Sequence, residues 1–474
     1  MQRKFKTDKK YQQYKGFICQ EKVQNFFTGR IWIKELAPFP QPLIETYIKH
    51  GYLQERPGIH TKKSAFLQTP QYRCERCLNE VQYEYIKFDC ARCQRKCVYC
   101  RHCINMGRVS RCTTLLTWNG QEPCRQTNHI LDWQSQFTKL QEKAALELEN
   151  SIKLGRSHLL HAVCGAGKTE ILFQATLTAL KQGKRVAIAT PRTDVVLELF
   201  PRFQQVFPKT TIHALYGNAP AQQGFGQLVL ATTHQLYRFE QAFDVMIVDE
   251  ADAFPYTFDE TLQRAVLKAK KPEAPIGFVT ATPSRKLLQR MKQENWGYSF
   301  IPQRYHGFPL PVPRYDSLFN YDKDFKNGRI PRKLQGWLEQ QLAEGKPFLM
   351  FFPTIELMEV AEPLFQAIDA RIEAVHAEDP NRKEKVMRLR NEEVPGLLTT
   401  TILERGVTIK NVQVAIVGAE SPIFTDSALI QISGRAGRNA SFPDGDIVFF
   451  HHGVTFAMDR ARAEILRMNQ VEVK

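Results

Sequence analysis

The chain has 474 residues, of which 43% are hydrophobic and 24% charged, with a formal net charge of +16 and a pI near 9.3. Its length allows two to four domains with sizeable cores, and no stretch approaches the roughly 18 consecutive apolar residues that a membrane-spanning helix needs. Residues 1–6 lead into no apolar signal segment. We therefore expect a cytoplasmic chain with a polyanionic partner such as DNA or RNA.

The positive charge is concentrated in the first quarter of the chain. Residues 1–130 contain 23 Lys and Arg against 10 Asp and Glu, whereas the remainder contains 42 against 39. Residues 1–70 mix aromatic and basic side chains with Pro38, Pro40, Pro42 and Pro57, which favours a small appended fold over a long helix. We expect a basic N-terminal region here, with nucleic-acid contact or plain solubility as the use of its charge.

A cysteine-rich module is predicted at residues 71–125. Eight of the 11 cysteines fall within 39 of its residues, from 74 to 112: Cys74, Cys77, Cys90, Cys93, Cys97, Cys100, Cys103 and Cys112. A Cys-x2-Cys turn directs two sulfurs at one tetrahedral Zn²⁺ ion, and two such turns complete a structural site. A reducing compartment disfavours disulfides, while an iron–sulfur cluster stays an alternative. The spacing alone leaves the pairing of the eight ligands open. Basic residues between them favour some nucleic-acid contact: Arg92, Arg95, Lys96 and Arg101.

A phosphate-binding loop is predicted between an apolar run and a helical pattern. It consists of Ala162, Val163, Cys164, Gly165, Ala166, Gly167, Lys168 and Thr169. Gly165 and Gly167 let successive backbone N–H groups turn inward around phosphates, and the helix that follows adds its positive N-terminus. Lys168 supplies a charge to the β- and γ-phosphates, and Thr169 a hydroxyl to Mg²⁺. Ala162 stands where the commonest form of this loop has glycine.

Two adjacent carboxylates, Asp249 and Glu250, follow the apolar run 245–248 and open the sequence Asp-Glu-Ala-Asp. At the end of a buried strand, Asp249 is placed to hold Mg²⁺ and Glu250 to orient and deprotonate the attacking water. A solvated acidic turn is the simpler alternative. With the loop upstream, the pair predicts nucleotide hydrolysis.

Two arginines near the far end complete the predicted catalytic set. The stretch 431–438 places Arg435 and Arg438 three residues apart, which we expect to lie on one helical face. Guanidinium groups that reach the γ-phosphate across a cleft stabilise the charge that develops in phosphoryl transfer. A surface salt-bridge pair is the alternative.

Helical patterns alternate with β-branched strands over residues 131–300, and again over the last third of the chain. This alternation predicts α/β lobes with parallel sheets and helices on both faces, with ligands at the carboxyl ends of the strands. The proline-rich segment 307–313 reads as the link between them. We therefore divide this part of the chain into a first lobe at 131–300 and a second lobe at 307–474.

In combination, these motifs resemble superfamily 2 helicases and translocases of the DEAD-motif type. Further blocks stand in the expected order: 138–141, 189–193, 231–234, 280–284, 351–354, 399–401 and 404–406. The resemblance implies two RecA-like lobes. It also implies that Gln141 and Gln431 contact the nucleotide, and that Arg192, Thr233 and Thr400 contact nucleic-acid backbone.

The order of the segments resembles the ComFA family of late competence proteins. A basic N-terminal region comes first, then a cysteine module, then the two helicase-like lobes, here called the motor. The segment 99–109 is similar to that family's zinc region. The resemblance implies Cys74, Cys77, Cys100 and Cys103 as the primary zinc ligands, with Cys90, Cys93, Cys97 and Cys112 available for a second site. It further implies an ATP- and Mg²⁺-dependent translocase of single-stranded DNA at the cytoplasmic face of the membrane. Its partners would be a membrane DNA channel and a small phosphoribosyltransferase-like competence protein, with an oligomer left open.

Three other functions remain as alternatives. A primosomal replication-restart helicase resembles this chain in combining cysteines with the same motor, but its cysteine module lies near the second lobe. DEAD-motif RNA helicases usually lack such a module. The third alternative is a zinc-containing nucleic-acid adaptor that does not hydrolyse ATP. Such an adaptor is expected to have lost Lys168, Glu250 or Arg438, and all three residues are present.

Overall fold

The computed structural model describes residues 17–62, 70–220, 222, 224–403 and 409–471. The predicted block at 404–406 lies outside this part of the chain. The described residues form two compact units. One takes the residues up to 135 together with 146–158 and 172–278, and the other takes 136–145, 159–171 and 279 onward.

A small three-stranded antiparallel sheet forms the base of the N-terminal region. Its strands are β1 (Ile31–Ile33), β8 (Thr114–Trp118) and β2 (Leu53–Pro57), in the order β1-β8-β2. Helices α1 (Glu21–Phe27) and α2 (Gln41–Lys49) pack against it through buried Phe27, Tyr47 and Leu116. Strand β8 belongs to the predicted cysteine module, whereas β1 and β2 belong to residues 1–70. The segments 1–70 and 71–125, which we expected to be separate, therefore share one sheet.

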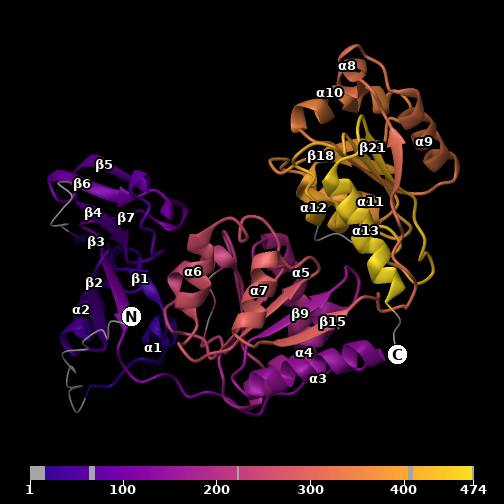
Figure 1. Cartoon of the computed structure of the whole chain (residues 1–474). Coiled ribbons are helices and arrows are strands. Elements are labelled where there is room, and N and C mark those ends of the chain that lie inside the picture. Colours follow the sequence, from indigo (N-terminus) through magenta and orange to yellow (C-terminus); the bar gives the residue numbers. More distant parts are fainter. Residues whose placement is uncertain (1–16, 63–69, 221, 223, 404–408, 472–474) are drawn as a thin grey trace. The chain divides into compact units, whose positions relative to one another are not determined.

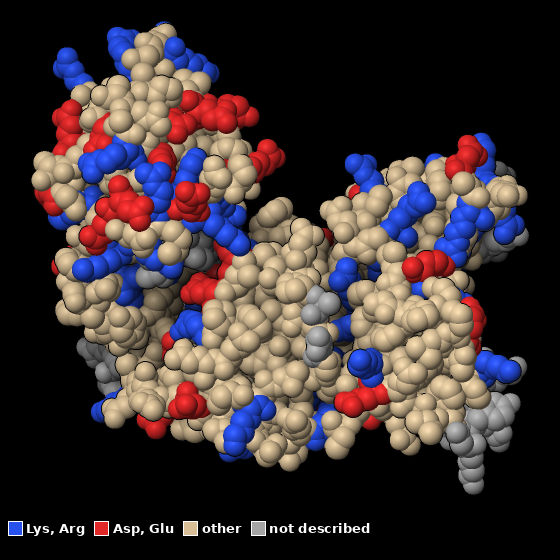
Figure 2. All heavy atoms as spheres, turned by 180° about the vertical axis from the view of Figure 1, so that it is seen from behind, with Lys and Arg blue, Asp and Glu red and all other residues tan. Residues whose placement is uncertain are grey.

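The cysteine module is inserted between β2 and β8. Its hairpins are β3 (Ile59–Lys62) with β4 (Gln71–Cys74), and β5 (Tyr85–Cys90) with β6 (Arg95–Cys100), to which β7 (Val109–Ser110) adds. Short 3-10 turns complete the region: η1 (Lys34–Leu36), η2 (Gln82–Glu84) and η3 (Ile104–Met106). Figure 2 shows more Lys and Arg than Asp and Glu on this module. The four basic residues predicted to favour nucleic acid, Arg92, Arg95, Lys96 and Arg101, are exposed.

A seven-stranded sheet of the order β11-β12-β10-β13-β14-β9-β15 forms the first α/β lobe. The strands are β9 (His158–Ala162), β10 (Val186–Thr190), β11 (Ile212–Leu215), β12 (Leu228–Thr232), β13 (Val245–Asp249), β14 (Ile276–Thr280) and β15 (Gly297–Ile301). Its helices are α3 (Lys139–Lys153), α4 (Lys168–Lys181), α5 (Thr193–Val206), α6 (Glu260–Ala269) and α7 (Arg285–Gln293), with η4 (Thr233–Arg238) after β12. The pairs β11·β12, β12·β10 and β10·β13 are parallel, as the apolar runs predict.

The second lobe is a six-stranded parallel sheet of the order β16-β21-β20-β17-β19-β18. Its strands are β16 (Arg314–Ser317), β17 (Phe348–Phe351), β18 (Glu373–Val375), β19 (Gly396–Thr399), β20 (Gln413–Val417) and β21 (Ile447–His451). The elements around it are α8 (Tyr321–Lys326), α9 (Arg332–Ala343), α10 (Ile355–Gln366), α11 (Arg382–Arg390), α12 (Asp426–Ser433), α13 (Phe456–Gln470) and η5 (Thr401–Leu403).

Strand β17 shows why both faces of this sheet are covered. Leu349 and Phe351 belong to one buried apolar cluster, while Phe348 and Met350 belong to another on the opposite face. Helices α8, α9 and α10 cover one face and α11, α12 and α13 the other (Figure 1). The α/β fold class, with two doubly wound parallel-sheet lobes after a basic, cysteine-rich region, is therefore confirmed.

Candidate functional site

The phosphate loop lies between the buried strand β9 and the first residue of α4. Gly165 and Gly167 have φ angles of +84° and +74°, which favour glycine. At Gly167 a Cβ would also stand 2.2 Å from Nε2 of Gln141. That amide is buried and donates to the carbonyl of Ala166 at 2.9 Å, so the glutamine predicted to contact the nucleotide holds the loop in this structure.

The acidic pair ends β13, which lies two places from β9 in the same sheet. Asp249 is buried, and its Oδ1 accepts a hydrogen bond from the backbone N–H of Glu250 at 2.9 Å. Glu250 itself has a φ of +54°, a conformation that non-glycine residues rarely adopt and that concentrates at functional turns. The chain thus reverses sharply at the residue assigned to water activation.

The arginine motif corrects one prediction. Helix α12 ends at Ser433, so Arg435 and Arg438 lie in the turn that follows, not on a helical face. Gly437 turns the chain between the two arginines with a φ of +66°, and a Cβ there would meet the carbonyl of Pro443 at 2.1 Å. Arg438 closes the turn by donating from Nε to the carbonyl of Gly434 at 2.9 Å.

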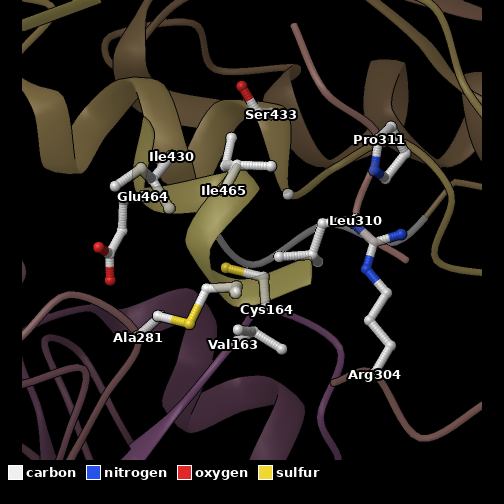
Figure 3. Close-up of a pocket in the computed structure, with 12 residues that line it drawn as sticks. Val163, Cys164, Ala281, Arg304, Leu310, Pro311, Ile430, Ser433, Glu464 and Ile465 are labelled. Carbon is white, nitrogen blue, oxygen red and sulfur yellow. The ribbon is translucent and has the colours of Figure 1, made fainter. Parts of the chain in front are cut away.

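Arg304 joins this region although no motif predicted it. Its guanidinium is 2% exposed, donates to the carbonyl of Gly437 and lines a pocket with Val163 and Cys164 (Figure 3). Burial, with a smaller contribution from the charge of Arg438, lowers the pKa of Arg304 to about 10. Within the same unit, Sγ of Cys164 lies 2.8 Å from Oε1 of Gln431. Its position three residues before the proline-rich segment 307–313 is the sequence signal that could have indicated it.

The three predicted nucleic-acid contacts occupy different environments. Arg192 occupies the N-cap position of α5 without a side-chain capping bond, and Thr400 follows β19 and is half-buried. Thr233 begins η4 and is fully buried, whereas His234 beside it is exposed. Of this block, therefore, His234 presents the accessible side chain.

The eight module cysteines form two groups of four. Cys74, Cys77, Cys100 and Cys103 make the first cluster, and Cys90, Cys93, Cys97 and Cys112 make the second. Sulfur pairs lie 3.8 Å apart for Cys74 and Cys103, and 3.7 Å for both Cys77–Cys100 and Cys90–Cys112. Four thiolates at Zn–S distances of about 2.3 Å in a tetrahedron stand about 3.8 Å apart. Both donor sets therefore fit a zinc ion.

Neighbouring donors support the thiolates in both clusters. In the first, the side-chain amide of Asn79 donates to Sγ of Cys100 at 3.8 Å. Buried Arg76 donates to the carbonyls of Cys103, Met106 and Gly107 at 2.6 to 2.7 Å, so the two Cys-x2-Cys turns hold each other. In the second, backbone hydrogen bonds, foremost from Cys93, lower the pKa of Cys90 to about 7.

Comparison with known proteins identifies the family. The chain is 41% identical over 460 residues to competence protein ComFA of Bacillus subtilis, covering 97% of this chain and 98% of that one. It is 38% identical to competence protein ComFA of Streptococcus pneumoniae, covering 78% and 86% of the two chains. The chain belongs to the ComFA family. The family model of the ComFA N-terminal domain matches residues 10–117 of the chain.

Both motor lobes of this ComFA family member also match helicase models. The model described as the res subunit of type III restriction enzymes matches residues 134–285, and the helicase conserved C-terminal domain matches 331–440. Dbp5 of S. cerevisiae, in a structure bound to RNA and ADP BeF3, has a similar fold. It superposes with a TM-score of 0.53 at 16% identity, over 71% of this chain and 89% of that one. The chain is a helicase-like competence ATPase.

Proposed function

We propose that this protein uses ATP to move single-stranded DNA during DNA uptake in natural competence. The family membership, which spans almost the whole chain, carries the proposal. A phosphate loop, an acidic pair and an arginine motif in helicase order supply the parts that such a motor needs.

Each part has one role in this proposal. Lys168 and Thr169 would hold the phosphates and Mg²⁺ of bound ATP together with Asp249, and Glu250 would take a proton from the attacking water. Arg435 and Arg438 would contact the γ-phosphate of bound ATP and stabilise its charge. Hydrolysis removes that contact. The contacts to one DNA strand through Arg192, Thr400 and η4 would then alternate between two states and move the strand.

Zinc would be structural in both cysteine clusters. Four thiolates leave no open coordination position, and such sites contribute directly to folding. The exposed basic residues around the second cluster then serve as extra contacts for phosphate groups.

We further propose that the protein works at the cytoplasmic face of the cell membrane, beside a DNA channel and a small phosphoribosyltransferase-like protein. Among the described helices, none is both long and apolar enough to cross a membrane. The proposal includes attachment through these protein partners.

ATP hydrolysis by the zinc-replete protein tests the function. It is measured without nucleic acid and with single-stranded DNA, duplex DNA or single-stranded RNA at matched salt. We expect selective stimulation by single-stranded DNA. Stimulation by RNA alone would point to an RNA helicase, and no hydrolysis under any condition to an adaptor.

Two variants test the assigned chemistry. Lys168→Ala should abolish hydrolysis by weakening nucleotide binding, while Glu250→Gln should abolish hydrolysis and still bind nucleotide. An exposed lysine, Lys286→Ala, serves as the control. Parental hydrolysis in either catalytic variant would contradict the mechanism.

A further inference from the structure

Both turns of the first cysteine cluster contact the helicase lobe within one compact unit. His102, between ligands Cys100 and Cys103, lies with Nε2 3.1 Å from the hydroxyl of Tyr237 on η4. The same nitrogen lies 3.4 Å from Oδ2 of Asp259 and contacts the hydroxyl of Thr261, the N-cap and second residue of α6. One imidazole therefore touches two elements of the motor.

The other turn of the cluster contacts α6, and a lysine of α6 links it to η4. Lys268 of α6, which is half-buried, donates to the carbonyl of Arg76, between Cys74 and Cys77, and to the carbonyl of Tyr237 at 2.9 Å. Arg264, one helical turn earlier, donates to the carbonyl of Leu78 at 3.4 Å. Helix α6 thus has a polar contact with each Cys-x2-Cys turn.

These contacts adjoin the parts assigned to DNA and to hydrolysis. Element η4 starts with Thr233 and His234, the block expected at nucleic-acid backbone. Residue 259 is joined to Glu250 by successive turns, in which Ala253 N–H bonds to the Glu250 carbonyl at 2.9 Å and Asp259 N–H to the Pro255 carbonyl at 3.0 Å. Buried Tyr256 anchors the middle of this segment.

We propose that His102 is a positioning residue that fixes η4 and the start of α6 against the first cysteine cluster, so that an intact cluster sets the motor's response to single-stranded DNA. The inference rests on the proposed function and deepens it. The first cluster then acts as part of the motor, and its metal need not touch DNA or ATP. Both elements keep their fold without His102, but lose a shared anchor.

Substitution at His102 and Tyr237 tests the inference in the full-length zinc-loaded protein. His102→Ala should raise the DNA concentration for half-maximal ATPase stimulation by about tenfold, the scale expected when a partly buried hydrogen bond to a charged group is removed. His102→Gln, which replaces Nε2 with an amide nitrogen, should restore it to within about twofold. His60→Ala is the matched control, because His60 is an exposed histidine of the same module.

Tyr237→Phe removes only the hydroxyl on the motor side. The double variant His102→Ala/Tyr237→Phe should show a smaller effect than the product of the single ones, since both remove the same contact. Zinc content, measured on each variant, should equal that of the parent because no ligand changes. The KM for ATP without DNA should also stay unchanged.

Three outcomes overturn the inference: an unchanged DNA response in His102→Ala, an unchanged response in Tyr237→Phe, or independent effects in the double variant. If single-stranded DNA fails to stimulate the parent protein, the proposed function fails instead. The two failures are therefore separable in one set of assays.

Discussion

The two cysteine clusters offer the same ligands in different surroundings. All four sulfurs of the first cluster belong to buried residues, and its turns contact α6 and η4. In the second cluster Cys93 and Cys112 are partly exposed, and the neighbouring Arg92 pairs with Glu35 of η1. Identical coordination chemistry can therefore support the motor in one place and brace a surface hairpin in the other. The difference comes from what packs around each site.

The largest effect should come from breaking the first cluster. Cys103→Ser removes one ligand, so we expect one metal ion fewer per chain and a loss of about tenfold or more in stimulation by single-stranded DNA. Metal analysis and the ATPase assay measure both quantities. If Cys93→Ser were equally harmful, the proposed division of roles would be wrong.

Arg76 should matter for folding more than any other arginine of the module. Arg76→Met leaves one buried and two partly buried carbonyls without this donor, which should lower the free energy of unfolding by about 3 kcal/mol. Denaturant unfolding, followed by a probe in the first unit, measures the change. Arg76→Lys, which retains the charge and part of the donor set, should recover some of it. A loss below about 0.5 kcal/mol in Arg76→Met would contradict this account.

The two clusters should release their metal to a chelator at different rates. A chelator should take metal first from the second cluster, because Cys93 and Cys112 are partly exposed. We expect two phases of metal release, with stimulation by DNA kept within about twofold after the first, since a surface site contributes little to the motor. In Cys93→Ser the fast phase should be absent. Simultaneous loss of metal and stimulation would contradict the order.

The smallest effect belongs to Arg92. It pairs with Glu35 at the surface, where such ion pairs contribute about 0–1 kcal/mol. Arg92→Met should therefore change the unfolding free energy by less than about 1 kcal/mol. The same denaturation assay makes this the matched counterpart of Arg76→Met. Equal losses in the two variants would remove the contrast between a buried and an exposed arginine.

Local patterns predicted the two lobes well. Apolar runs such as 245–248 correspond to buried parallel strands, because such strands need apolar residues on both faces. The glycine-rich loop and the Cys-x2-Cys turns are similarly local, since neighbouring residues create their geometry.

Long-range pairing was beyond the sequence patterns. Nothing in Thr114–Trp118 indicates that it pairs with Ile31–Ile33 in a sheet shared by the two N-terminal segments. The burial of Thr233 and the contacts of His102 depend on tertiary packing in the same way. Around Arg435 the sequence does indicate the observed turn, because Gly434 and Gly437 favour a turn over a continued helix.

The register of the small sheet gives the cysteine module an evolutionary property. Pro57 and Thr114 face each other across β2 and β8, and the whole module emerges between them. Its two ends therefore lie as close as the two sides of an ordinary hairpin. The module can therefore change in length between these two ends while β2 and β8 stay paired, as long as its first cluster keeps the contacts with α6 and η4.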